Sequence, residues 1–352
     1  MTFLITGASG FIGRHLGAEL TARGHHVLAL MRRPQTLPAL QQTITALGGR
    51  GHLVDAIAGD LDQPGLGIRS PLPPLSAIIH LGARFAWGLD RDNARRTNTQ
   101  GSLAVAELAR QQGCRLVFIS GFMLENQAHL ARLGIAPDHP DNSRWQRVYQ
   151  RAGGYEASKL EAALRVRQRA AEQDIELVEV QPATVAGHSH SGLLDPAQPL
   201  YSLIHNLAGG RLAMVPGSPA HWLPLVAVDT LSALIAQAAL AKAPPSRLLA
   251  LDPATPNLQG LLAMLADELG RRAPRQHVPL GLLAALLKLP GLATLMQTAP
   301  EALHFIHPTR FDTATSAAFM AQQGMAPAPI EQAIRASARH YLQQGAAGLR
   351  TA

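Results

Sequence analysis

The sequence predicts an α/β fold, in which a doubly wound parallel sheet is followed by a smaller and mostly helical lobe. Short apolar runs alternate with helix-like segments through the first half of the chain, and this alternation is typical of parallel sheets covered by helices on both faces. A glycine-rich turn joins the first run to the first helix, and the alternation loosens after Pro182. The 352 residues are enough for one such domain and an additional lobe.

Six apolar runs are expected to form the strands of the sheet, at residues 3–6, 26–30, 53–59, 77–81, 115–120 and 176–182. Beyond them, loops rich in His, Gly, Ser and Pro alternate with helices expected at residues 229–241, 257–270 and 329–344. We therefore expect a sheet domain over residues 1–182 and a substrate-binding lobe over residues 183–352, which is free to return strands to the sheet.

Composition and charge exclude several kinds of partner. The formal charge is +7, and the arginines responsible are scattered without a block of like charge, so a nucleic-acid partner is not expected. Cys114 is the single cysteine, which excludes a disulfide framework within the chain. The histidine pairs His188 with His190 and His304 with His307 have no cysteine or acidic residue at ligand spacing, so no metal is expected.

Nothing in the sequence predicts export or membrane insertion. Met1 leads directly into the first strand, which leaves no room for a signal peptide. The most hydrophobic later stretch begins at Gly281, and Lys288 and Pro290 interrupt it, so no transmembrane segment is expected. These features favour a cytoplasmic protein.

The turn "TGASGFIGRH" places Gly7, Gly10 and Gly13 between the first strand and the first helix. Glycines permit a sharp turn and allow a pyrophosphate to approach the helix N-terminus, where N–H groups and the helix dipole favour an anion. In this context the pattern predicts a Rossmann-type dinucleotide-binding domain. A tight turn that binds nothing is the alternative.

The second strand ends in "LALMRRP", with Arg32 and Arg33 where sheets that bind NAD usually present an acidic residue to the ribose. Arginine suits a 2′-phosphate, because it can hold the phosphate through paired N–H donors. The sequence therefore predicts NADP(H) as the cofactor and leaves NAD(H) open. A pair of solvated arginines is the alternative.

The chain resembles the extended short-chain dehydrogenase/reductases, which include the NAD-dependent epimerases and dehydratases. The segments that carry the resemblance are the G-x-x-G-x-x-G turn, "GDL" at residues 59–61, "HLGA" at residues 80–83, "NTQGS" at residues 98–102, and a Y-x-x-x-K pair. The cofactor contacts that the resemblance implies are Gly7, Gly10, Phe11, Ile12, Gly13, Arg32, Arg33, Asp60, Leu61, His80, Gly82, Ala83, Asn98, Lys159 and Pro182.

Tyr155 and Lys159 form the Y-x-x-x-K pair, near the start of a predicted helix. Residues four apart lie on one face of a helix, so the phenol and the ammonium should point the same way. The resemblance implies that the tyrosine exchanges a proton with a carbonyl oxygen and that the lysine holds the nicotinamide ribose. A nearby ammonium should lower the pKa of the phenol from its usual value near 10. Two residues that share a helix face by chance are the alternative.

Ser120 lies at the end of the fifth predicted strand, in "FISGFM". The resemblance implies a pair of hydroxyl residues here, of which the second polarises the substrate carbonyl, whereas this chain has Gly121 at the second position. Ser120 is our candidate for this hydroxyl. A backbone N–H in its place, or a weakened or inactive relative, are the alternatives.

Four segments resemble one branch more closely, the male-sterility and thioester-reductase-like group: "AGDLDQPGLGI", "HLGARFAWGL", "GYEASKLEA" and "QPATVAGHSHSG". This resemblance implies NADPH-dependent reduction of an acyl thioester or related carbonyl, and it allows a homodimer. Apolar stretches at residues 200–209 and 279–296 favour an apolar substrate, unless these leucines are ordinary core. A nucleotide-sugar epimerase or dehydratase, and a non-catalytic dinucleotide-binding protein, remain the competing functions.

Overall fold

The structure, a computed structural model, describes residues 1–86, 88–287 and 300–350. Its central element is a sheet of seven strands in the order β3-β2-β1-β4-β5-β6-β10. The strands are β1 (Thr2–Thr6), β2 (His26–Met31), β3 (Val54–Ala58), β4 (Ala77–His80), β5 (Arg115–Ile119), β6 (Leu177–Pro182) and β10 (Arg247–Ala250). The neighbouring pairs from β3 to β6 are parallel, so the predicted doubly wound α/β fold is confirmed.

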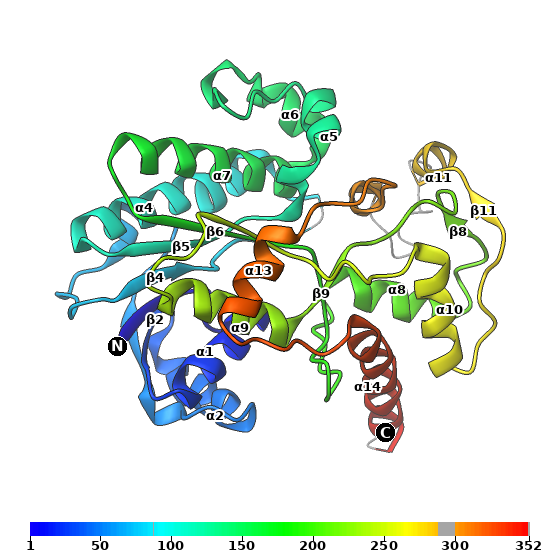
Figure 1. Cartoon of the computed structure of the whole chain (residues 1–352), viewed down its shortest axis with the longest axis horizontal. Coiled ribbons are helices and arrows are strands. Elements are labelled where there is room, and N and C mark those ends of the chain that lie inside the picture. The colour runs from blue at the N-terminus through cyan, green and yellow to red at the C-terminus, as the bar shows by residue number, and fades with distance from the viewer. Residues whose placement is uncertain (87, 288–299, 351–352) are drawn as a thin grey trace. The chain divides into compact units, whose positions relative to one another are not determined.

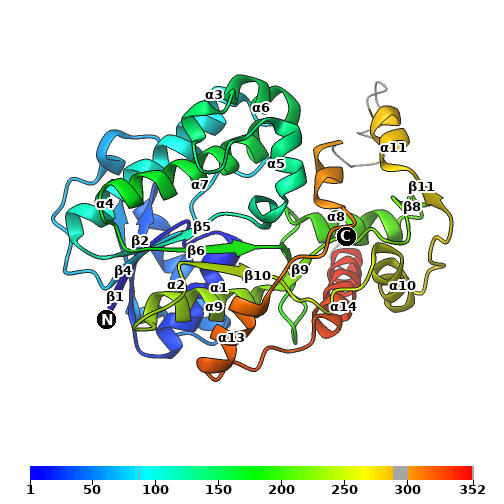
Figure 2. The ribbon, with the colours of Figure 1, turned by 45° about the horizontal axis from the view of Figure 1, so that its top comes forward.

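Helices cover both faces of this sheet. Figure 1 shows α4 and α7 on one face, with α1, α2 and α9 on the other, and Figure 2 agrees. Their bounds are α1 (Phe11–Ala22), α2 (Leu37–Ala46), α4 (Gly101–Gln112), α7 (Gly154–Glu172) and α9 (Val228–Leu240). Because both faces are covered, the strands carry almost unbroken runs of buried apolar residues such as Ile5, Ile78 and Val117. A buried carboxylate in β6, Glu179, departs from this pattern.

The chain forms two compact units. The first comprises Met1–Gln181, Leu231–Leu249 and Thr315–Gly324, and the second comprises Pro182–Thr230, Ala250–Ala314 and Met325–Ala352. Two segments beyond residue 182 thus belong to the same unit as the first strands. The division of the chain into domains after residue 182 stays a prediction.

The second unit is mostly helical. Its helices α8 (Pro199–Ala208), α10 (Leu258–Glu268) and α14 (Ile330–Arg350) pack against one another. Two short parallel pairs accompany them, β7 (Thr184–Ala186) with β9 (Leu225–Ala227), and β8 (Val215–Pro216) with β11 (His277–Val278).

The described residues also form several shorter α-helices. They are α3 (Arg91–Ala94), α5 (Gln127–Leu133), α6 (Trp145–Ala152), α11 (Leu280–Leu286) and α13 (Ala314–Gln322). Within residues 1–86, 88–287 and 300–350, no helix combines the length and apolar character that a bilayer crossing requires.

Candidate active site

The turn between β1 and α1 is built so that only glycine fits. Gly7 has a φ of +73°, in the left-handed region that glycine tolerates. A Cβ atom on Gly13 would lie 2.2 Å from the carbonyl oxygen of Gly7. The first turn of α1 carries no acidic side chain. The helix therefore presents its N-terminal N–H groups to an approaching anion without a competing carboxylate.

We predict that Gly13→Ala disrupts this turn. The added methyl group overlaps backbone atoms of residues 7 and 8, and forced overpacking of this kind costs about 1–3 kcal/mol. We expect a lower Tm and weaker binding of NADPH, measured by thermal unfolding and by titration of nucleotide fluorescence. Gly281→Ala is the control, because its methyl group would meet no atom of the described residues within 4 Å. Equal Tm and Kd values for Gly13→Ala and the unaltered protein would contradict the assignment.

A cavity of about 680 Å³ opens at the carboxyl ends of β1, β2, β3 and β4. Its lining includes eight of the predicted cofactor residues, which are Gly7, Gly10, Arg32, Arg33, Asp60, Leu61, Gly82 and Ala83. Eleven further residues line it that were not among the predicted cofactor contacts, namely Thr6, Ser9, Leu30, Met31, Thr36, Gly59, Asp62, Leu81, Arg84, Phe85 and Thr97. This edge, beside the first strand of a doubly wound sheet, is where such sheets bind nucleotides.

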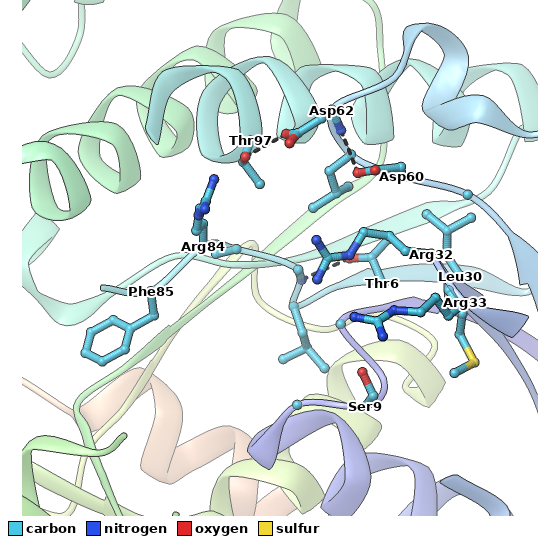
Figure 3. A pocket seen from close by; sticks show the side chains of 18 of the residues that line it. Thr6, Ser9, Leu30, Arg32, Arg33, Asp60, Asp62, Arg84, Phe85 and Thr97 are labelled. Atoms are coloured by element: carbon cyan, nitrogen blue, oxygen red, sulfur yellow. Dashed lines mark hydrogen bonds between the residues drawn. The ribbon is translucent and has the colours of Figure 1, made fainter. Parts of the chain in front are cut away.

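Arg32 and Arg33 follow directly after β2, and both are exposed. Figure 3 shows their guanidinium groups pointing in the same direction within the cavity. Among the residues that the structure describes, neither side chain has a carboxylate partner. The two arginines thus place two positive charges in the lining of the cavity.

The acidic residues of the cavity are engaged in local contacts. A carboxylate oxygen of Asp60 accepts a hydrogen bond from the backbone N–H of Asp62, 3.0 Å away. Asp62 in turn accepts a 2.6 Å hydrogen bond from the Thr97 hydroxyl, and both contacts are drawn in Figure 3. These bonds fix the loop after β3 against the π-helical turn Arg95–Gln100.

His80 lies beneath the cavity rather than in its lining, with 2% of its surface exposed. The Thr6 hydroxyl accepts from the N–H of Gly82 (3.0 Å) and so donates to His80 Nδ1 (2.6 Å). Nε2 lies 2.9 Å from the hydroxyl of Ser102, which donates to the carbonyl of Asn98. This network assigns the proton to Nε2, and burial, together with the charge of Lys159, lowers the pKa of His80 to about 3. A neutral histidine therefore ties β1 and β4 to α4.

Asn98 is fully buried and clamps the loop that follows β4. Its side-chain oxygen accepts from the N–H of Arg84 at 2.7 Å, while its amide nitrogen donates to the carbonyl of Arg84 at 3.2 Å. The same nitrogen lies 2.9 Å from the hydroxyl of Ser158, which donates to the carbonyl of Tyr155. Asn98 thus joins the wall of the cavity to the start of α7.

Seven predicted cofactor residues lie outside the lining of the cavity. They are Phe11, Ile12, Gly13, His80, Asn98, Lys159 and Pro182. Their contacts with a cofactor stay predictions.

Tyr155 lies next to the cavity wall through an aromatic contact. Its ring meets the ring of Phe85 edge-on, with 4.6 Å between the centroids, and Phe85 lines the cavity. Figure 3 shows Phe85 with Arg84 at the end of the cavity away from Arg33. Burial, with a smaller contribution from the negative charge of Glu156, raises the pKa of Tyr155 to about 12. The lowering of this pKa that we expected from Lys159 is therefore not seen, and burial dominates the shift.

Lys159 points toward the end of β5. Its ammonium donates a 2.6 Å hydrogen bond to the carbonyl of Ile119 and lies 5.4 Å from the centroid of the Phe118 ring. Burial lowers the pKa of Lys159 to about 8, and the negative charge of Glu179 opposes this change. The chain thus places the predicted lysine beside the predicted serine, one residue beyond Ile119.

The hydroxyl of Ser120 donates a short hydrogen bond to the buried carboxylate of Glu179. Glu179 also accepts a 2.6 Å hydrogen bond from Arg167. Polarisation of a substrate carbonyl by Ser120 stays a prediction, and it requires the hydroxyl to turn away from Glu179. At Gly121 an added Cβ atom would meet nothing within 4 Å in the part of the chain that the structure describes.

In the second unit, the fold brings an acidic residue to a histidine pair. Asp229 lies with His188 and His190 so that one polar atom of each falls within 4.8 Å of the others. Ser189 donates to both oxygens of Asp229, at 2.9 Å from its N–H and 2.5 Å from its hydroxyl. Nδ1 of His188 accepts from the N–H of His190 at 3.2 Å. These hydrogen bonds explain why the three residues cluster: they hold the loop that contains His188 and His190 against the start of α9.

Comparison with known proteins places the chain among reductases. A family of NAD-binding proteins described as male sterility protein matches residues 5–235. The isonitrile lipopeptide synthase of Streptomyces coeruleorubidus is 27% identical over 261 residues, which cover 69% of this chain and 17% of that protein. A putative dihydroflavonol 4-reductase of Synechocystis is 28% identical over 192 residues, which cover 53% of this chain and 49% of that protein.

The fold is also shared with a solved reductase domain. The terminal R domain from the myxalamid PKS-NRPS biosynthetic pathway has a TM-score of 0.74 at 19% identity, with 98% of this chain and 91% of that domain covered. The chain spans half or less of the length of the two relatives named above. The family match covers well over half of the chain. The chain therefore belongs to the male sterility protein family of NAD(P)-binding reductases, relatives of the extended short-chain dehydrogenases, and its cofactor is a nicotinamide dinucleotide.

Proposed function

We propose that this protein uses NADPH to reduce a carbonyl or an acyl thioester, with Tyr155 as the proton donor. One observation carries the proposal: the cavity runs from Arg32 and Arg33 to Phe85, and the ring of Phe85 contacts the ring of Tyr155. Cationic donors at one end and a protonated phenol beside the other suit a cofactor that is anchored by phosphate and reacts at its far end.

The residues present fit such a cofactor. The glycine turn leaves no room for a Cβ atom at Gly13, and α1 has no acidic residue in its first turn, as an approaching pyrophosphate requires. At the end of β2, where a ribose 2′-hydroxyl would call for a carboxylate, the chain presents two arginines instead. A 2′-phosphate would be held there by charge-assisted hydrogen bonds from Arg32, helped by Arg33.

The chain's own groups then move the proton. When bound, the dinucleotide supplies the hydride. Tyr155 carries its proton at neutral pH, because its pKa is raised to about 12, and it donates this proton from its hydroxyl oxygen to the oxygen of the carbonyl. Lys159, fixed by the carbonyl of Ile119, holds a positive charge near the phenolate that forms. A ketone or aldehyde thereby becomes an alcohol, whereas an acyl thioester becomes an aldehyde and releases a thiol.

We propose an apolar substrate, although part of the apolar sequence serves the core. Leu200, Ile204 and Leu207 of α8 are buried within the second unit. On α11, Leu282 and Leu286 are 54% and 39% exposed, and these two side chains are our candidates for contact with an apolar substrate. The remainder of the apolar stretch, residues 288–296, lies outside the described residues. One curated relative is named a lipopeptide synthase, which is consistent with an acyl substrate.

The substrate class can be tested with a series of aldehydes and acyl-CoA thioesters of increasing chain length. Each methylene buried contributes about 0.8 kcal/mol, so we expect KM to fall by up to about fourfold per methylene until the apolar site is filled. Oxidation of NADPH is the readout, and a panel of UDP-sugars is assayed in parallel. A KM that does not depend on chain length, or activity on the sugars alone, would contradict the proposal and favour an epimerase or dehydratase.

A further inference from the structure

Glu179 is a carboxylate in the middle of a buried strand. Its neighbours in β6, Val178 and Val180, are buried and apolar, and Glu179 is itself only 1% exposed. An ionised carboxylate in such surroundings is costly unless it is paired and hydrogen-bonded. A group of this kind requires a physical explanation.

Two donors from different elements satisfy this carboxylate. The Ser120 hydroxyl, at the end of β5, donates to Oε1. Arg167, on α7, donates from Nε to Oε2 at 2.6 Å, and one quarter of its side chain is exposed. Both oxygens of the carboxylate are thus bound by donors, one from β5 and one from α7.

The same end of β5 is held from the other side by Lys159. The ammonium donates to the carbonyl of Ile119, and Ile119 directly precedes Ser120, which donates to Glu179. Phe118, whose ring lies 5.4 Å from the ammonium, is the residue paired with Glu179 across the two strands. The positive and negative groups are therefore bound to adjacent residues of one strand end.

Charged and titratable groups on two strands interact with the ammonium. His80 on β4 feels its positive charge, and the negative charge of Glu179 on β6 acts on the ammonium. The network of His80 keeps that ring neutral. Glu179 is the anion in this set, and Arg167 is the cation that partly neutralises it.

We propose that Glu179 is a positioning residue: through Ser120 it fixes the end of β5 at which Lys159 binds, and its charge keeps the Lys159 ammonium protonated. The effect of Glu179 on turnover rests on the proposed function given above. A purely structural ion pair between Glu179 and Arg167 would stabilise the fold without any effect on the protonation of Lys159.

The chain is well suited to a direct measurement, because Lys159, Lys242 and Lys288 are its only lysines. Protein labelled with carbon-13 at the lysine Cε gives three signals, which Lys242→Arg and Lys288→Arg assign by elimination. The chemical shift of Lys159 is then followed against pH in the unaltered protein, in Glu179→Gln and in Arg167→Gln. The pH dependence of NADPH oxidation is recorded for the same proteins.

The two variants are expected to shift the titration of Lys159 in opposite directions. Glu179→Gln removes the anion, so the midpoint should fall by about one pH unit from its value near 8, and the alkaline limit of activity should fall with it. Arg167→Gln leaves the carboxylate without its neutralising partner, so the midpoint should rise. Glu161→Gln is the matched control, because Glu161 is a buried carboxylate on α7 held by Arg165, and it should leave the midpoint unchanged.

An unchanged midpoint in both Glu179→Gln and Arg167→Gln would overturn the assignment. If Glu179→Gln does not fold, the Arg167→Gln variant is sufficient by itself: a Lys159 midpoint that does not rise in this variant would overturn the assignment. Opposite shifts in a protein that oxidises NADPH with none of the carbonyl substrates would support the link between Glu179 and Lys159 and reject the proposed function.

Discussion

Tyr155→Phe is expected to lower kcat by ~100-fold or more and to leave the Kd for NADPH nearly unchanged. A positioned general acid contributes about 10²–10⁴ in rate, and the substitution removes only the oxygen that carries the proton. The ring itself remains, so its edge-on contact with Phe85 at the cavity wall is kept. Steady-state oxidation of NADPH and a separate binding titration measure the two quantities.

Tyr149→Phe is the matched control for this change. Tyr149 is also buried, and its hydroxyl donates a 2.9 Å hydrogen bond to Glu161. Its loss should reduce stability by about 1 kcal/mol without a comparable loss of kcat. Full activity in Tyr155→Phe, or equal losses in the two variants, would remove Tyr155 from the proposed mechanism.

Arg32→Glu is expected to reverse the preference between the two dinucleotides. Hydrogen bonds to charged groups contribute about 1.5–3 kcal/mol, so the Kd for NADPH should rise by roughly 10- to 100-fold. The new carboxylate could accept from a ribose 2′-hydroxyl, so binding of NADH should improve. Titration of both nucleotides against each variant measures the change.

Arg69→Glu makes the same change of charge at an exposed residue outside the lining of the cavity. It should affect both dinucleotides alike and only weakly, because exposed charges are screened by salt. Equal Kd values for NADPH and NADH in the unaltered protein would contradict the assignment of Arg32.

Much of the lining of the cavity could be predicted from the sequence because it depends on local backbone. The turn at Gly7 and Gly13 needs a φ and a close approach that only glycine provides, and this need is visible in the spacing. Arg32 and Arg33 follow a strand whose carboxyl end must face the cavity in any parallel sheet. The position of each of these residues depends only on a single element and on the direction in which the chain runs through it.

The residues that the sequence did not reveal depend on packing between distant segments. Phe85 gains its role from contact with Tyr155, seventy positions later, and no local pattern records that contact. Ser120 and Glu179 meet because β5 and β6 are neighbours in register, which turns a candidate donor toward a buried carboxylate. The pKa of Tyr155 was expected to fall and is raised, because burial is a property of the folded chain.

Asp229, in the second unit, is another residue whose contacts could not be predicted from the sequence. It lies some forty positions from His188 and His190 in the sequence, so spacing alone did not associate it with them. The fold closes this distance through the hydrogen bonds from Ser189 to the start of α9.

Transfer of deuterium from labelled NADPH tests the central claim most directly. The protein is incubated with NADPH deuterated at the transferable position of its nicotinamide ring and with a long-chain aldehyde or acyl-CoA thioester, and the product is analysed by mass spectrometry. The account predicts one deuterium on the former carbonyl carbon, formed at a rate that Tyr155→Phe lowers by ~100-fold or more. A product without deuterium, or labelled product formed equally fast by Tyr155→Phe, would contradict it.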